Sequence, residues 1–183
     1  MLIAEDIRLS PLREAHLDAA YEAHLDIANR GRWFPRGVVS ESRFRTRFAE
    51  TGYWEPDEGT LLIRTGKDEL AGHIEFFPPV GYWDAYELSY QLYDDRYAGR
   101  GLVTAAVRLL VDYLFATKKR HRIQLVIVPE NGASRRIAEK CGFVLDGTIR
   151  GAFFNDGRNH DVVMYSLLRT DPRPWHDRTG GAG

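Results

Sequence analysis

The chain has 183 residues, of which 44% are apolar, and its formal net charge at pH 7 is −1. This length and composition are sufficient for one well-buried core, so we expect a single domain over residues 1–170. The near-zero charge argues against a nucleic-acid partner bound over a broad basic surface.

The sequence also lacks the usual signs of membrane, secreted and metal-binding proteins. No apolar run is long enough to span a bilayer, and residues 1–6 have no basic stretch ahead of an apolar one. The one cysteine, Cys141, cannot form an internal disulfide, which fits a reducing compartment. Six histidines without metal-ligand spacing predict no metal site. We therefore expect a cytoplasmic protein with no membrane partner.

The first elements that the pattern predicts are strands. Two extended runs, 60–64 and 71–77, flank a polar turn at 65–69 and predict a β-hairpin. Residues 86–93 predict a further strand, in which Glu87 alternates with apolar residues and shares one face with Ser89.

The loop that follows this strand is the most informative segment. Residues 96–101 are Arg-Tyr-Ala-Gly-Arg-Gly and precede a long amphipathic helix that begins near Leu102. Gly99 and Gly101 permit a positive φ and a close approach of the backbone to a ligand, and N–H groups of a first helical turn point toward an anion. The pattern predicts a phosphate site. It matches neither the phosphate loop of nucleotide hydrolases nor the glycine fingerprint of dinucleotide folds.

The rest of the chain predicts a parallel unit and a second hairpin. Residues 123–128 are nearly all apolar, as in a strand covered on both faces, so strand, helix and strand form a parallel βαβ unit. The basic run 118–122 ends the helix, where cations complement its dipole. Asp156-Gly157 predicts a hairpin, and residues 171–183, which have no apolar face, predict a disordered tail.

Four segments, which follow one another along the chain as they do in the family, resemble the GNAT family of acyl-CoA N-acyltransferases. The loop 96–101 resembles the Arg/Gln-x-x-Gly-x-Gly/Ala pyrophosphate loop of that family. Residues 129–143 resemble the Asn-x-x-Ser helix ending in Gly-Phe that is typical of the RimJ and RimL ribosomal-protein acetyltransferases. Residues 7–13 with 29–35, and 146–168, are similar to the beginning and the terminal hairpin of that branch. The resemblance covers residues 5–168.

The resemblance implies an α+β GNAT fold: a central mixed, mostly antiparallel twisted sheet of about six to seven strands with one parallel βαβ unit, flanked by about four helices. It also implies acetyl-CoA as cosubstrate and no metal. The residues expected to bind acetyl-CoA are Leu92, Tyr93, Arg96, Tyr97, Ala98, Gly99, Arg100, Gly101, Leu102, Val103, Asn131 and Ser134. The residues expected to bind the acceptor are Trp33, Phe34, Glu75 and Tyr90.

Two residues are the candidates for catalysis. Glu87 is the candidate base that removes the amine proton, and Glu75 or water is the alternative. Many relatives have a tyrosine where this chain has Ala138, so Ser134 is the candidate acid for the CoA thiolate. A helix-capping role is the alternative for Ser134, and also for Asn131, which would otherwise orient the pantetheine arm.

The acceptor stays open at this point. It is a protein N-terminal α-amine or a small amine such as an antibiotic, an aminosugar or a polyamine. The acidic residues Glu55, Asp57 and Glu58 would suit a cationic acceptor, although such a run is usually a solvated loop. The alternative to an enzyme is a catalytically silent CoA-binding module of the same fold, and either would be a monomer or a homodimer.

Overall fold

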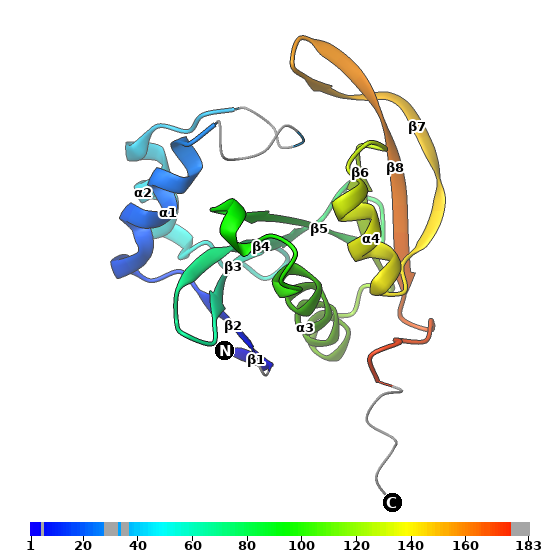
Figure 1. Ribbon diagram of the computed structural model, residues 1–183, viewed down its shortest axis with the longest axis horizontal. Coiled ribbons are helices and arrows are strands. Elements are labelled where there is room, and N and C mark those ends of the chain that lie inside the picture. The colour runs from blue at the N-terminus through cyan, green and yellow to red at the C-terminus, as the bar shows by residue number, and fades with distance from the viewer. Residues whose placement is uncertain (5, 28–32, 34–36, 177–183) are drawn as a thin grey trace, which may run out of the picture. The chain divides into compact units, whose positions relative to one another are not determined.

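The computed structural model describes residues 1–4, 6–27, 33 and 37–176 (Figure 1). Within them the chain forms eight strands, four α-helices and two short 3-10 helices. In chain order these are β1 (Leu2–Ala4), β2 (Ile7–Pro11), η1 (Glu14–His16), α1 (Leu17–Leu25), α2 (Glu41–Thr51), β3 (Gly59–Thr65), β4 (Leu70–Phe77), β5 (Ala85–Leu92), η2 (Asp95–Tyr97), α3 (Leu102–Thr117), β6 (Arg122–Ile127), α4 (Gly132–Lys140), β7 (Val144–Asn155) and β8 (Arg158–Leu168).

The strands form a mixed sheet in the order β1-β2-β3-β4-β5-β6-β8-β7. The register between β5 and β6 is parallel, whereas β1 to β4 form successive antiparallel pairs, as do β6 with β8 and β8 with β7. The α+β fold class with one parallel βαβ unit is therefore confirmed. The sheet has eight strands, more than expected, because the three-residue strand β1 adds an edge beyond β2.

The predicted elements lie close to their expected positions. The first hairpin is β3–β4, the strand at 86–93 is β5, and the predicted helix is α3, which begins at Leu102. The hairpin at Asp156-Gly157 is β7–β8. None of the helices in the described part of the chain is long and apolar enough to cross a membrane.

The chain divides into two compact units. Unit 1 comprises Met1–Phe77 and Ser89–Ala106, and unit 2 comprises Pro78–Leu88 and Val107–Gly183. The division passes through β5 and α3, so each unit contains a part of both elements. The single domain expected over residues 1–170 stays a prediction.

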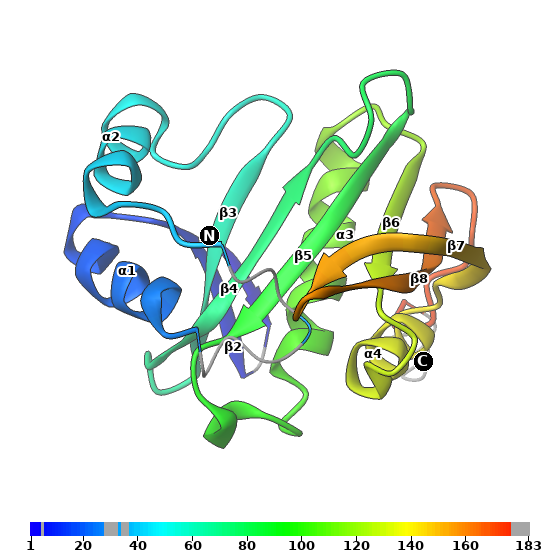
Figure 2. The ribbon, with the colours of Figure 1, turned by 90° about the horizontal axis from the view of Figure 1, so that it is seen from above.

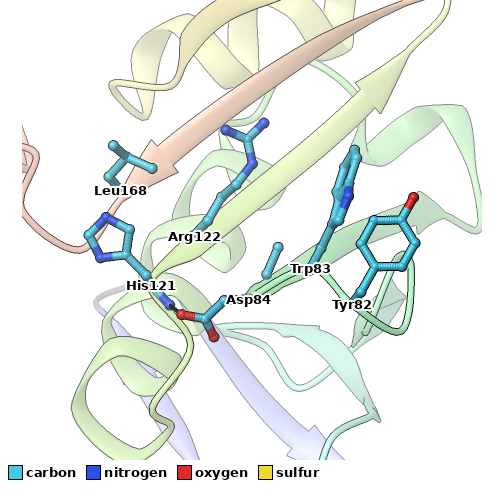
Figure 3. Close-up of a pocket in the computed structure, with 7 residues that line it drawn as sticks. Tyr82, Trp83, Asp84, His121, Arg122 and Leu168 are labelled. Atoms are coloured by element: carbon cyan, nitrogen blue, oxygen red, sulfur yellow. Dashed lines mark hydrogen bonds between the residues drawn. The ribbon is translucent and has the colours of Figure 1, made fainter.

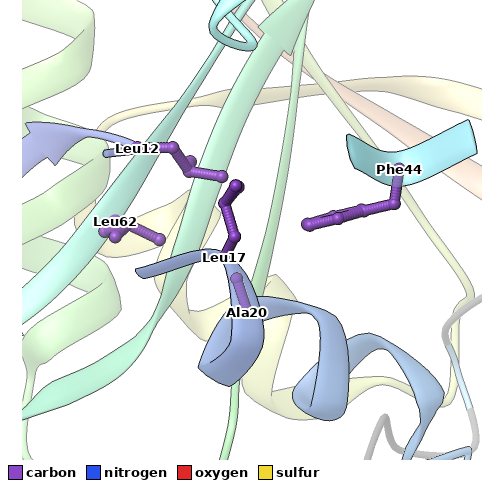
Figure 4. Close-up of a cluster of buried hydrophobic side chains, with 5 residues drawn as sticks. All are labelled: Leu12, Leu17, Ala20, Phe44 and Leu62. Carbon is purple, nitrogen blue, oxygen red and sulfur yellow. The ribbon is translucent and has the colours of Figure 1, made fainter. Parts of the chain in front are cut away.

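In unit 1, β2, β3 and β4 run side by side (Figure 2). An apolar cluster joins α1 and α2 to this part of the sheet (Figure 4). Helix α2 has well-defined ends, because the Ser40 side chain accepts a hydrogen bond from the Arg43 N–H at 3.3 Å and Gly52 ends the helix with φ 62°. The buried members of the cluster are Leu12, Leu17, Ala20, Phe44 and Leu62.

In unit 2, the carboxyl end of α3 is capped by an arginine that is distant in sequence. Arg169 is the residue after β8. Its guanidinium donates to the carbonyl oxygens of Phe115, Lys118 and Arg120, the last at 2.8 Å. The predicted partner of the helix dipole was the basic run 118–122. That run lies beyond the last residue of α3, Thr117, and the guanidinium at the helix end belongs to Arg169.

The C-terminal segment also contacts α3. The carboxylate of Asp112 accepts hydrogen bonds from Arg173 and from the Trp175 indole, each at 2.7 Å, and lies 3.0 Å from His176 Nε2. The segment expected to be a tail therefore begins with residues that are bound to α3, which its composition does not indicate. Residues 177–183 lie outside the described part of the chain.

Candidate functional site

The loop between β5 and α3 has the backbone conformation that a phosphate site requires. Gly99 has φ 71° and Gly101 has φ 77°, which glycine adopts without strain. A Cβ atom built on either glycine would meet nothing within 4 Å among the described residues, so the backbone faces open space. The Ala105 N–H donates to the Gly101 carbonyl at 3.0 Å. The N–H groups of the residues that precede Ala105 in the first turn of α3 have no acceptor within the helix.

A buried tyrosine anchors two cations in this loop. Tyr97 is 2% exposed, and its hydroxyl accepts a hydrogen bond from Arg96 Nη2 at 2.8 Å. The guanidinium carbons of Arg96 and Arg100 lie 4.8 Å and 6.0 Å from the centre of the Tyr97 ring. Positive charge and left-handed glycines therefore occur in one short loop, which is a combination that suits phosphate oxygens.

The other residues predicted to bind acetyl-CoA in unit 1 lie on either side of the glycines. The side chains of Leu102 and Val103 are buried, so only their backbone N–H groups are suited to a ligand, whereas Ala98 is exposed. Leu92 ends β5 and is half-buried.

Tyr93, directly after β5, has a histidine partner. Its hydroxyl lies 3.0 Å from His73 Nδ1, and the two ring centres are 5.5 Å apart. Burial raises the pKa of Tyr93, and the charge of Glu75 raises it further, so the phenol is neutral at neutral pH.

Glu75 on β4 is a half-buried carboxyl group in unit 1. Burial raises its pKa, whereas a hydrogen bond from the Ser89 side chain and the charge of Arg47 lower it. Of the other residues expected to bind the acceptor, Trp33 and Tyr90 are half-buried, and Phe34 lies outside the described residues.

Glu87 on β5 lies opposite a buried glutamine in unit 2. The parallel register ends with the pair Glu87–Gln124, and Gln124 Nε2 donates to Glu87 Oε2 at 2.9 Å. Burial raises the pKa of Glu87, and this hydrogen bond lowers it. A carboxylate with these two properties is suited to accept a proton from an amine near neutral pH.

The alternation predicted for β5 holds only over its first half. Tyr86 and Leu88 are buried and Glu87 is half-buried, but beyond Ser89 the pattern reverses, with Gln91 7% exposed. The reversal coincides with a close approach of two backbones, because a Cβ atom on Gly72 of β4 would lie 2.1 Å from the Gln91 carbonyl oxygen. A glycine at such a close approach often marks a local irregularity of the strand, which accounts for the change in the alternation of buried side chains.

The amino end of α4 assigns the capping role to Asn131. Its side-chain oxygen accepts a hydrogen bond from the Ser134 N–H at 3.1 Å. Ser134 therefore contributes its backbone N–H to the cap, and its half-buried hydroxyl is not the capping group. Ala138, at the tyrosine position of many relatives, is fully buried. Cys141 is fully buried as well, and burial raises its pKa to about 11, as expected for a core thiol.

A separate pocket of about 560 Å³ lies at the amino ends of β5 and β6 in unit 2 (Figure 3). None of the described residues that are predicted to bind acetyl-CoA or the acceptor lines this pocket. Among the described residues, no three His, Cys, Asp or Glu side chains are grouped as a metal ion would require. The residues that line the pocket are Tyr82, Trp83, Asp84, Ala85, His121, Arg122 and Leu168.

Some partners of the candidate residues were missed by the sequence analysis. Gln124 is 1% exposed and bonds to Glu87, and His73 bonds to Tyr93. A signal for Gln124 was present, because it is the one polar residue in the apolar run 123–128, and a buried amide must find partners. The run indicated a covered strand, but it did not indicate which side chain would bond to the amide.

Comparison with known proteins agrees with the fold. The model of the Acetyltransferase (GNAT) domain matches residues 6–144. Bacillus subtilis (strain 168) YdaF, which carries a ribosomal N-acetyltransferase name, is 34% identical over 92 residues, which are 50% of this chain and 45% of YdaF. The chain thus spans about half the length of this curated relative.

Two solved structures have similar folds. RimL, a ribosomal α-N-protein acetyltransferase in complex with coenzyme A, has a TM-score of 0.76 at 22% identity, over 91% of this chain and 96% of that one. Vibrio cholerae spermidine N-acetyltransferase in complex with CoA and spermine has a TM-score of 0.79 at 20% identity, over 91% and 98%. At these identities the likeness concerns the fold. Because the family model matches well over half of the sequence, the chain belongs to the GNAT acetyltransferase family.

Proposed function

We propose that the protein is an acetyl-CoA-dependent N-acetyltransferase that transfers the acetyl group directly to a primary amine in a ternary complex. The observation that carries this proposal is the loop 96–101, in which two left-handed glycines face open space ahead of α3 and two arginines flank a buried tyrosine. Membership in the GNAT family and the CoA bound to structural relatives support the same ligand.

The reaction requires a neutral amine, a proton acceptor and a proton donor. The amine nitrogen attacks the thioester carbon, so a C–N bond forms, the C–S bond breaks, and the sulfur leaves with the electron pair. Glu87 accepts the amine proton, directly or through water, and later releases it to solvent, while Ser134 hands a proton to the leaving thiolate and regains one from solvent. An α-amine with a pKa near 8 is already about one tenth neutral at pH 7, so a half-buried carboxylate is a sufficient base for it, whereas an alkylamine with a pKa near 10.4 requires more help from the base.

Ser134→Ala separates the proposed acid from a structural serine. We expect kcat to fall by ~10²-fold, because the thiolate loses its proton donor. The affinity for acetyl-CoA should change only a few-fold, and the melting temperature should stay near that of the wild type, because the capping group is Asn131. Steady-state kinetics and thermal melting measure these quantities.

Asn131→Ala is the matched control for this variant, and it should lose about 1 kcal/mol of stability with the cap. A Ser134→Ala protein that turns over normally but melts earlier would assign Ser134 a structural role. The proton would then come from solvent or from a tyrosine.

A cluster in unit 1 supports a cationic acceptor. Arg47 Nη2 lies 2.8 Å from Glu58 Oε1, and its guanidinium carbon lies 4.8 Å from the centre of the Tyr53 ring. The charges of both Arg47 and Glu58 act on the pKa of Glu75. An aromatic face and the Glu58 carboxylate already hold a side-chain cation here, and the pKa of the Glu75 carboxyl group responds to the charge of that cation. The same groups suit the ammonium group of a polyamine.

Glu58→Gln tests this choice of acceptor. With a polyamine, KM should rise roughly fivefold because one exposed ionic contact is lost, and kcat should change little. Asp18→Asn is the control, since it breaks a comparable ion pair with Arg45 on the same helix, α2. For a peptide with a free N-terminus and no other positive charge, KM should be the same in the wild type and in both variants. Equal losses with polyamine and peptide would count against the cationic acceptor and favour the protein N-terminus.

A further inference from the structure

A continuous hydrogen-bonded chain of side chains in unit 2 begins at Glu87. Gln124 Nε2 donates to Glu87 Oε2 at 2.9 Å, and Gln124 Oε1 accepts from Arg122 Nε at 3.3 Å. Arg122 Nη2 donates to Asp146 Oδ2 at 2.6 Å, and the Ser166 hydroxyl donates to Asp146 Oδ1 at 2.9 Å. The network links β5, β6, β7 and β8.

The two neighbours of Gln124 determine the orientation of its amide. A guanidinium has only donors, so it must face the amide oxygen, and an ionised carboxylate has only acceptors, so it must face the amide nitrogen. With Arg122 in place, a flipped amide would set donor against donor. Arg122 therefore makes Gln124 present N–H groups, rather than a carbonyl oxygen, to Glu87.

The orientation of the amide affects the charge state of Glu87. An N–H donor stabilises the carboxylate, whereas a carbonyl oxygen would stabilise the protonated acid. We propose that Gln124 and Arg122 are positioning residues that keep Glu87 in its proton-accepting form. This inference rests on the proposed role of Glu87 as the base.

Burial makes this control effective. Gln124, which bonds to Glu87, is 1% exposed, and Ser166, which bonds to Asp146, is 4% exposed. Water therefore cannot readily replace either side chain as a hydrogen-bond partner. Two charged groups belong to the hydrogen-bonded network, Arg122 from β6 and Asp146 from β7, and the guanidinium carbon of Arg120 lies 5.0 Å from the centre of the Tyr86 ring, next to Glu87 in sequence. Of these, Arg122 is the one that bonds to the Glu87 partner.

The first test is the pH profile of kcat/KM for Arg122→Met. Without the guanidinium the amide is free to flip, so a larger fraction of Glu87 is protonated and the acidic limb moves to higher pH. We expect kcat/KM to fall about tenfold on the acidic side and to approach the wild-type value on the alkaline side. Gln124→Met, which removes the donor itself, should show the same pattern.

Arg173→Met is a closely matched control. The ion pair Arg173–Asp112 measures 2.7 Å with side chains 27% and 35% exposed, whereas Arg122–Asp146 measures 2.6 Å with 24% and 37%. The Asp112 cluster joins α3 to the C-terminal segment and includes none of the residues bonded to Glu87. This control should keep the wild-type pH profile even if it lowers the melting temperature.

Arg122→Lys keeps the inference testable if the methionine variant does not fold. Lysine retains the charge for Asp146 but lacks the planar fork that serves two partners at once. We expect near wild-type stability together with the displaced acidic limb.

Chemical rescue gives an independent readout. Arg122 lines the pocket of about 560 Å³ (Figure 3), so its replacement by alanine opens a path for a small cation. Millimolar guanidinium should restore activity to Arg122→Ala on the acidic side of the profile, and it should not affect Arg173→Ala.

The outcomes distinguish this inference from the proposed function. If Glu87→Gln is fully active, Glu87 is not the base and the inference falls with that role. If Glu87→Gln is impaired but the Arg122 and Gln124 variants keep the wild-type pH profile, the positioning role is wrong and the base assignment stands.

Discussion

Gly101→Asp is expected to abolish acetyl-CoA binding. Gly101 has φ 77°, which an aspartate adopts only with strain, and the new carboxylate would repel the pyrophosphate from the N–H groups ahead of α3. Gly99→Val should also abolish binding, without adding a charge, because a β-branched residue is strained at the φ of 71° that Gly99 adopts. Acetyl-CoA should raise the melting temperature of the wild type and leave both variants unchanged.

Gly52 provides the matched control for backbone strain. It ends α2 with φ 62°, and its Cβ would also meet open space among the described residues. Gly52→Val and Gly52→Asp should therefore destabilise the fold and still respond to acetyl-CoA. A wild-type protein that ignores millimolar acetyl-CoA and responds to another phosphate compound would count against the proposed cosubstrate.

Glu87→Gln should lower kcat/KM by ~10³-fold near neutral pH, because the amide keeps the shape of the side chain and cannot accept a proton. The loss should shrink as pH rises, since a larger fraction of the amine is then neutral without help. Burial raises the pKa of Glu87, so in the wild type the activity should appear only as pH rises above that value and the carboxylate forms. A pH series of kcat/KM for both proteins measures these changes.

Glu75→Gln decides between the two candidate bases. Burial also raises the pKa of Glu75, and Ser89 bonds to it as Gln124 bonds to Glu87, so the two carboxyl groups are chemically comparable. We expect Glu75→Gln to change KM for the acceptor more than kcat. If Glu87→Gln is fully active across the pH range and Glu75→Gln loses its activity, Glu75 is the base.

Local features of the site were predictable because short segments determine them. Gly99 and Gly101 permit a positive φ where the loop turns into α3, and both have one. The apolar spacing after Leu102 predicted the helix from its first residue. These predictions depend on neighbours within a few positions, where backbone sterics and periodicity are decisive.

Contacts between distant segments were not predictable in the same way. The bond from Gln124 to Glu87 depends on the register of a parallel pair, and the cap that Arg169 places on α3 depends on where β8 ends. The roles of Asn131 and Ser134 could not be separated, because a cap and a ligand both use a polar side chain at the start of a helix. The hydrogen bond from the Ser134 N–H to the Asn131 side chain shows that Asn131 caps the helix, and the catalytic role of Ser134 stays a prediction.

Acetyl transfer to a defined set of amines tests the proposed activity most directly. The wild-type protein is incubated with acetyl-CoA and with a polyamine, an aminosugar, an aminoglycoside or a peptide with a free N-terminus, and product mass is measured together with released CoA thiol. We predict that at least one acceptor gains an acetyl group in step with thiol release. If acetyl-CoA raises the melting temperature but no acceptor is acetylated, the result would contradict the proposed activity and favour a CoA-binding module without catalysis.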